Sequence, residues 1–179
     1  MKICVFCSAN DNIEPEYFDA AASLGSWMGK EGHDLVFGGC DMGLMRATAD
    51  AVRSAGGRCI GVVPSIIEKG GRKYEELDVD IPCDNLSDRK DLMLQYSDVS
   101  VALPGGIGTL DEIFTVASAA TIGYHSKKVI VLNIKGFFEP LRGLLDSLQD
   151  KGFIRGDYHR FIDFADDMGM LREMLMRKE

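Results

Sequence analysis

The sequence predicts an α/β fold built on a doubly wound parallel sheet with helices on both faces. Short apolar runs of β type alternate with helical patterns from one end of the chain to the other. Nearly continuous apolar strands are typical of a parallel sheet that is covered on both sides. The 179 residues suffice for one domain, at roughly 150 residues per domain. Since no repeat or Pro/Ser-rich linker marks a boundary, we expect a single Rossmann-like domain over residues 1–179.

The predicted elements alternate along the chain. The apolar runs predicted as strands are residues 3–7, 35–37, 59–63, 99–103 and 129–132. Apolar residues recur at steps of three and four, the period of an amphipathic helix, at residues 17–29, 44–55, 86–96, 110–122, 140–148 and 168–176. The stretch 64–85 has no strong period, and we expect a mobile loop there rather than a lid or a subunit contact.

Composition and charge argue against several classes of function. With 28 acidic against 20 basic residues, the formal charge of −8 repels nucleic-acid phosphate, so no nucleic-acid partner is expected. The sequence contains no stretch of about 18 apolar residues and no signal-peptide pattern. We therefore expect a cytoplasmic protein without a membrane partner.

Cysteine and histidine usage predicts neither a disulfide framework nor a metal site. The five cysteines are an odd number at irregular spacing, which favours reduced thiols. Cys4 and Cys7 match C-x-x-C, but they lie in an apolar run, so buried structural thiols are favoured over a redox pair. The histidines form no ligand cluster, and no metal is expected; they are His33, His125 and His159.

A glycine-rich turn follows the fourth predicted strand and leads into a helix. Its Gly105, Gly106 and Gly108 let a ligand approach the backbone closely. Because N–H groups at a helix start carry partial positive charge, this turn predicts a phosphate site, although the lysine and hydroxyl of a P-loop are missing. An alternative stays open: Thr109 and Glu112 have the spacing of a capping box, which would give Glu112 a structural role.

A second glycine loop, at residues 38–43, also follows a predicted strand and opens a helix. Gly38 and Gly39 either grip another part of the same ligand or simply allow strand and helix to pack closely. A dinucleotide fingerprint would need G-x-G-x-x-G after the first strand, where the sequence has Ser8-Ala9-Asn10. NAD is therefore not an expected cofactor.

Arg89 lies on the apolar stripe of the helix predicted at residues 86–96, three residues from both Leu86 and Leu92. A guanidinium cannot lose its charge, so an inward arginine pairs with a carboxylate or holds an anionic ligand. The pattern leaves both interpretations open. Lys90 is one step round the helix, and by itself this position predicts a surface residue.

Together these residues resemble the LONELY GUY (LOG) family of cytokinin riboside 5′-monophosphate phosphoribohydrolases, whose members are often labelled lysine decarboxylases. The family motif P-G-G-x-G-T-x-x-E is complete at residues 104–112, and the family's Arg-Lys pair matches Arg89 and Lys90. The similarity covers residues 3–135. The combination is more specific than either glycine loop alone, and it favours functional roles for Arg89 and Glu112.

The resemblance implies a hydrolase that cleaves the N-glycosidic bond of adenosine 5′-monophosphate or its N6-substituted forms, releasing the base and ribose 5-phosphate. Arg89 and Glu112 would be the catalytic residues, with Glu112 stabilising a ribosyl cation-like transition state and orienting water. Residues expected to hold the phosphate and ribose are Lys90, Gly105, Gly106, Gly108, Thr109, Gly38, Gly39 and Ser8. Residues expected to line the substrate pocket are Met93 and Ser118.

The family pattern further implies a homodimer and no cofactor. Decarboxylation with pyridoxal phosphate would need a Schiff-base lysine and an acidic partner for the pyridine nitrogen, and the sequence offers no such constellation. We therefore discount the decarboxylase label.

The sequence departs from the family pattern where glycine, glycine, tryptophan and glutamine are usual, at Cys40, Arg46, Ala119 and Thr121. The last two changes are expected to alter the wall of the substrate pocket, which leaves the base open. Two other hypotheses are a non-catalytic carrier or sensor for a nucleotide or molybdenum cofactor, and a nucleosidase for another base. The presence of both Arg89 and Glu112 favours an enzyme, because a carboxylate would repel a simply bound anion.

Overall fold

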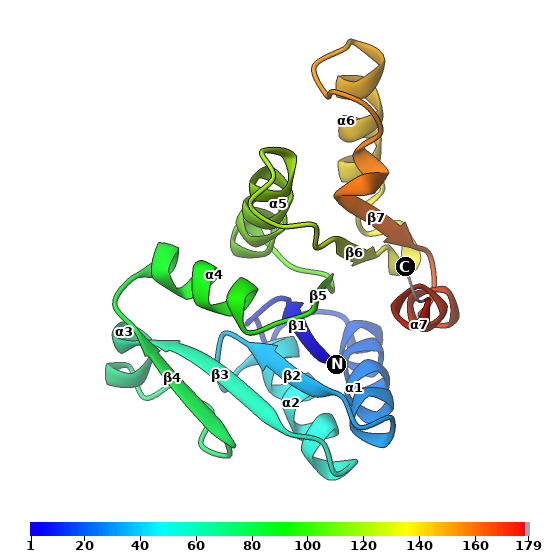
Figure 1. The fold of residues 1–179 in the computed structure, drawn as a ribbon. Helices are drawn as coiled ribbons and strands as arrows, with labels where there is room; N and C mark the ends of the chain where they lie inside the picture. Colours follow the sequence, from blue (N-terminus) through cyan, green and yellow to red (C-terminus); the bar gives the residue numbers. More distant parts are fainter. Residues whose placement is uncertain (178–179) are drawn as a thin grey trace.

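The computed structural model describes residues 1–177, whose strands form one seven-stranded sheet with parallel pairing throughout. The strands are β1 (Lys2–Phe6), β2 (Asp34–Phe37), β3 (Cys59–Pro64), β4 (Val79–Cys83), β5 (Val99–Ala102), β6 (Val129–Leu132) and β7 (Ile162–Ala165). Their spatial order is β4-β3-β2-β1-β5-β6-β7 (Figure 1). The predicted doubly wound α/β class is therefore confirmed.

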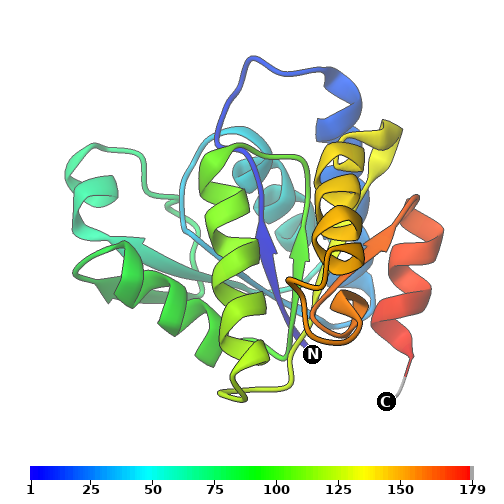
Figure 2. The ribbon, with the colours of Figure 1, turned by 90° about the horizontal axis from the view of Figure 1, so that it is seen from above.

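Helices cover both faces of this sheet (Figure 2). The helices are α1 (Pro15–Lys30), α2 (Gly43–Ser54), α3 (Ser65–Lys69), α4 (Leu86–Gln95), α5 (Ile107–Thr121), α6 (Glu139–Asp150) and α7 (Met168–Met176), with 3-10 turns η1 (Ile134–Gly136) and η2 (Tyr158–Arg160). One face carries α1, α2 and α7, and the other carries α4, α5 and α6. None of these helices is long and apolar enough to cross a membrane, within the part of the chain that the structure describes.

The central strand β1 has both of its faces buried. Ile3 and Val5 join the core beneath α1 and α2, whereas Cys4 and Phe6 join the core beneath α4 and α5. Each large apolar side chain buried in this way contributes about 1.5–3 kcal/mol. Since successive strand residues point to opposite faces, a sheet covered twice needs apolar residues at every position. This explains the unbroken apolar runs of the sequence.

The structure adds two strands that the periodicity did not predict, β4 and β7. The expectation of a mobile loop at residues 64–85 is wrong, because α3 and β4 lie in this stretch and the Tyr74 N–H donates to the Gly39 carbonyl at 2.9 Å. β4 is an edge strand with mostly exposed side chains, including Asp80 and Pro82. Charged residues and proline are usual on edge strands, and they remove the apolar signal by which a strand is recognised.

Candidate active site

The carboxyl ends of β1 and β5 meet in the middle of the sheet, where the strand order changes direction. The Ser8 N–H donates to the Pro104 carbonyl at 3.1 Å, so a backbone hydrogen bond joins the two strand ends. In doubly wound sheets, ligands bind in the crevice at such a switch point. The loops that follow β1 and β5 therefore define the candidate active site.

Gly105 brings the turn after β5 close to Ser8. A Cβ at Gly105 would lie 2.1 Å from Thr109 Oγ1 and 3.1 Å from the Ser8 nitrogen, so a larger residue does not fit without movement. Thr109 is itself buried, at 3% exposure. Gly105 and Thr109 therefore shape the turn by packing against each other.

The helix α5 begins at Ile107, three residues before the predicted start, with Gly106 as its N-cap. Thr109 is the third residue of the helix and Glu112 the sixth, so the capping-box interpretation is wrong. Gly106 stands at the N-cap with φ −95° and ψ −147°, and Gly108 is already the second residue of the helix. Glu112 is consequently left without a capping role.

The start of α5 is open toward the solvent. Ile107 is 88% exposed, and a Cβ at Gly106 or Gly108 would meet nothing within 4 Å. No side chain among residues 1–177 caps this helix. The first N–H groups of a helix have no intrahelical acceptor, and the helix dipole gives them partial positive charge. They are therefore well suited to bind a phosphate.

The start of α2, which follows the second glycine loop, is occupied instead. Asp11 Oδ1 accepts hydrogen bonds from the Gly43 N–H and from Arg46 Nη2, both at 3.0 Å. A carboxylate there neutralises the positive end of the helix dipole. The sequence does not predict this role of Asp11, since it lies 32 residues before Gly43 and no local pattern links them. Of the two glycine loops, the α5 loop is thus the better anion site.

Gly38 and Gly39 lie against protein atoms. A Cβ at Gly38 would be 1.4 Å from Arg89 Nη2, and a Cβ at Gly39 would be 2.5 Å from Val63 Cγ2. Gly39 also has a positive φ of 65°, which favours glycine. The geometry supports close packing for both glycines rather than the expected contact with phosphate or ribose.

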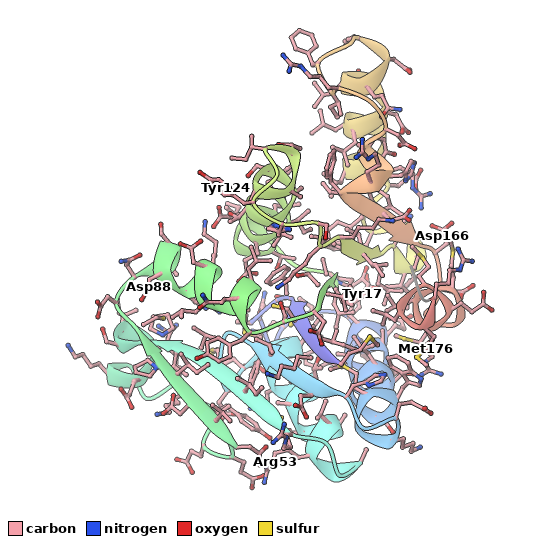
Figure 3. The ribbon with its side chains drawn as sticks, viewed as in Figure 1. Tyr17, Arg53, Asp88, Tyr124, Asp166 and Met176 are labelled. Carbon is pink, nitrogen blue, oxygen red and sulfur yellow. The ribbon has the colours of Figure 1, made fainter. Side chains whose placement is uncertain are left out.

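Arg89 and Glu112 meet across the interface of α4 and α5. Asn85 is the N-cap of α4, and its side chain accepts hydrogen bonds from the backbone N–H groups of Ser87 and Asp88. Asp88 is labelled in Figure 3. Arg89 follows on the inward face, and its Nη2 lies 3.9 Å from Glu112 Oε1. The side chains are only 12% and 8% exposed, respectively. The structure thus brings together the two expected catalytic residues.

Burial raises the pKa of Glu112 to about 7, against the opposing effect of the Arg89 charge. A carboxyl group with such a pKa exchanges a proton near neutral pH, as acid–base catalysts do. The thiols of Cys4 and Cys7 lie in the same field, and burial raises the pKa of both well above the usual range. These thiols stay uncharged and add no negative charge beside Glu112, and Arg89 is the positive charge that lies against it.

Lys90 Nζ binds both carboxylate oxygens of Asp111, at 2.9 and 2.8 Å. The pair joins α4 to α5, and the Lys90 side chain is 19% exposed rather than lying free on the surface. Asp111 therefore compensates the charge of Lys90, the residue for which the family resemblance implies a phosphate contact.

The two residues expected to line the substrate pocket, Met93 and Ser118, lie in different parts of the structure. Met93 is 1% exposed and belongs to the core beneath α4. Ser118 and Thr121 line a groove of about 490 Å³ between α5 and α6. At 1.5 Å rise per residue, Thr121 lies roughly 20 Å along α5 from Ile107. Ser118 and Thr121 thus lie far along α5 from its start, whereas Met93 lies in the core one helical turn after Arg89.

All five cysteines are free and buried, as the sequence predicts: Cys4, Cys7, Cys40, Cys59 and Cys83. Among residues 1–177, no group of three His, Cys, Asp or Glu side chains has the arrangement of a metal site.

Comparison with known proteins identifies the family. A family model described as "Possible lysine decarboxylase" matches residues 45–175. The chain is 35% identical over 178 residues to cytokinin riboside 5′-monophosphate phosphoribohydrolase LOG of Oryza sativa subsp. japonica, covering 99% of this chain and 72% of the rice protein. It is 32% identical to LOG2 of Arabidopsis thaliana, covering 97% of this chain and 82% of that protein. The chain belongs to the LOG family.

Membership of the LOG family confirms the resemblance seen in the sequence. The fold also recurs in a solved structure of the molybdenum cofactor carrier protein of Chlamydomonas reinhardtii, with a TM-score of 0.73, 22% identity and 98% coverage of both chains. At this identity the likeness concerns the fold alone. Glu112, the last residue of the LOG motif, lies beside Arg89 in this chain.

Proposed function

We propose that the protein hydrolyses the N-glycosidic bond of adenosine 5′-monophosphate and its N6-substituted forms, giving the free base and ribose 5-phosphate. The activity for which the LOG relatives are named, that of cytokinin riboside 5′-monophosphate phosphoribohydrolases, supports this function. The observation that carries it is the buried Arg89–Glu112 pair beside the uncapped start of α5. This arrangement offers a carboxyl group and an anion cradle to one phosphorylated sugar.

The phosphate binds at the start of α5. The backbone N–H groups of Gly106, Gly108 and Thr109 donate to its oxygens, and Gly105 lets the turn come close. The backbone hydrogen bond from Ser8 to Pro104 holds Ser8 next to this turn. Lys90 adds positive charge from the side, reduced by Asp111. This grip holds the ribose next to Glu112.

Glu112 in its ionised form stabilises the positive charge that develops on the ribose and orients the attacking water. The water oxygen bonds to C1′ as the bond to the base nitrogen breaks, and the electron pair of that bond leaves with the base. The attacking water gives up one proton and the base gains one, so that ribose 5-phosphate and the neutral base result. Arg89 either assists this departure or holds the phosphate and ribose. Decarboxylation would need a lysine that forms a Schiff base. Lys90, the lysine next to Arg89, is bound by Asp111, so the site does not support that reaction.

Chromatography of reactions with adenosine 5′-monophosphate and isopentenyladenosine 5′-monophosphate tests this function. We expect the wild type to release the free base and ribose 5-phosphate, and we expect Glu112→Gln and Arg89→Ala to lose at least about 100-fold in kcat/KM. Intact nucleotides that still raise the Tm would instead support the carrier or sensor hypothesis. Cleavage of other nucleotides alone would support a nucleosidase for another base.

We further propose a homodimer formed through the groove between α5 and α6. Apolar side chains line it, among them Phe114, Leu145 and Ile154, and Phe114 is 39% exposed. A second copy of α5 would bury this surface and would bring its own Ser118 and Thr121 into the interface. Light scattering at micromolar concentration tests this, with Phe114→Asp expected to shift a dimeric mass to a monomeric one. A monomeric wild type would contradict the proposal.

A single domain over residues 1–179 and a cytoplasmic location complete the proposal. The helices of residues 1–177 pack on one sheet, which supports a single domain. The five free cysteines fit a reducing compartment, which supports the location. Limited proteolysis tests the first point, and fractionation of the source cells tests the second.

A further inference from the structure

The Arg89 guanidinium lies directly against the α-carbon of Gly38, just after β2. A Cβ built at Gly38 would be 1.4 Å from Nη2, 2.5 Å from Cζ and 3.0 Å from Nε of Arg89. Three guanidinium atoms therefore occupy the space that any side chain at position 38 would fill. No other glycine among residues 1–177 lies so close to a charged side chain.

Hydrogen bonds do not hold the guanidinium in this place. Nε is buried and has no hydrogen-bond partner among residues 1–177. The contact of Nη2 with Glu112 is 3.9 Å, which exceeds hydrogen-bond distance. Buried donors in proteins are nearly always paired, and the unpaired Nε shows that no hydrogen bond among residues 1–177 fixes this part of the guanidinium. Steric fit against Gly38 and the charge of Glu112 are what remain to set the position of the group.

We propose that Gly38 is a positioning residue, whose missing side chain forms the notch that seats the Arg89 guanidinium beside Glu112 with its N–H donors free for the nucleotide. The role toward the nucleotide rests on the proposed function. The notch itself is a feature of the fold and can be tested without substrate. This role replaces the phosphate or ribose contact that the sequence predicts for Gly38.

A double-mutant cycle on thermal stability tests the notch directly. Gly38→Ala is expected to lower the Tm by about 3–10 °C in the wild-type background, because the added methyl group overpacks a filled site. In the Arg89→Ala background the notch is empty and the methyl group fits, so the same change should shift the Tm by less than about 2 °C. Equal losses in both backgrounds would overturn the proposal.

The outcome is decisive even if Gly38→Ala does not fold. Recovery of folded protein in Gly38→Ala/Arg89→Ala would support the notch, whereas failure of both variants would overturn it. Gly61→Ala is the matched packing control, since a Cβ there would lie 2.6 and 2.8 Å from the Leu77 methyl groups and not near Arg89. Its Tm loss should be the same with Arg89 present or absent.

Kinetics separates positioning from general destabilisation. With isopentenyladenosine 5′-monophosphate, Gly38→Ala should lower kcat at least about tenfold and move the pH–rate profile in the same direction as Arg89→Ala does, because the arginine charge leaves Glu112. Gly61→Ala should keep kcat within about twofold and leave the pH profile unchanged. A Gly38→Ala enzyme with wild-type kcat and profile would refute the positioning role. If the wild type cleaves no nucleotide, the proposed function fails while the Tm cycle still decides the notch.

Discussion

The Nη2 atom of Arg89 and the Oε1 atom of Glu112 lie 3.9 Å apart, close enough for charge attraction and too far for a hydrogen bond. The arginine therefore compensates only part of the cost of burying an ionised carboxylate. Burial dominates and raises the pKa of Glu112 to about 7. Ionisation of Glu112 near neutral pH consequently acts on stability as well as on catalysis.

Glu112→Gln should make the protein more stable at pH 8 than the wild type, by up to about 3 kcal/mol. The pKa of Glu112 is raised in the folded state from 4.5 to about 7. The folded protein therefore binds this proton more tightly than the unfolded chain, and its stabilising effect is lost as the pH rises from 4.5 to 7. Urea unfolding at pH 5 and pH 8 measures the difference between variant and wild type.

The two proteins should differ little at pH 5, where Glu112 is protonated in the folded state. Exposed Glu75→Gln is the control and should show no such pH-dependent gain. A gain of Glu112→Gln that is the same at pH 5 and pH 8 would contradict a buried carboxyl group that titrates near neutrality.

Gly108→Ala should separate ligand binding from stability. The methyl group meets nothing within 4 Å in the protein, and alanine favours the helix, so the free energy of unfolding should rise or stay within about 0.5 kcal/mol. The same methyl group intrudes on the phosphate at the start of α5. We expect KM for the nucleotide to rise about tenfold, equivalent to about 1.4 kcal/mol.

Gly143→Ala, on the exposed face of α6, is the matched control with an equally open environment. It should leave KM unchanged. An unchanged KM in Gly108→Ala as well would move the phosphate away from the α5 start.

Lys90→Met should lower the free energy of unfolding by only about 0.2–1 kcal/mol, because the partner Asp111 is 52% exposed and water screens the pair. KM should change by less than about threefold, since Asp111 already compensates the lysine charge. Steady-state kinetics and urea unfolding measure both effects. Asp111→Asn should lower KM slightly, because Lys90 is then released from its partner. A tenfold higher KM in Lys90→Met would contradict this prediction and would show that the lysine is a principal phosphate anchor.

Asp11→Ala should destabilise the protein by about 1 kcal/mol, as the loss of an N-terminal helix cap does. Asp11 accepts from the Gly43 N–H and from Arg46 Nη2, so it holds the loop after β1 against the start of α2. Arg46→Ala removes only the exposed ion pair and should cost less than about 0.5 kcal/mol. Denaturant unfolding of both variants checks the order, and a larger loss in Arg46→Ala would contradict the capping role.

The sequence by itself determined the fold class and the central elements. Apolar periodicity is a local property of the chain, so strands such as β1 and helices such as α4 could be predicted from it. The inward position of Arg89 also followed from helical spacing, and the complete motif at residues 104–112 predicted the family. The edge strand β4 was not predicted, because its exposed residues give no apolar pattern.

Tertiary structure alone decided how these elements work together. The pKa of Glu112 depends on burial between α4, α5 and the sheet, which residues far apart in the sequence create. Arg89 packs against Gly38, which lies 51 residues before it. Asp11 caps α2 at Gly43, which lies 32 residues after it. Steric fit and electrostatic field depend on distances in space, so only the folded chain gives each glycine and each charge its role.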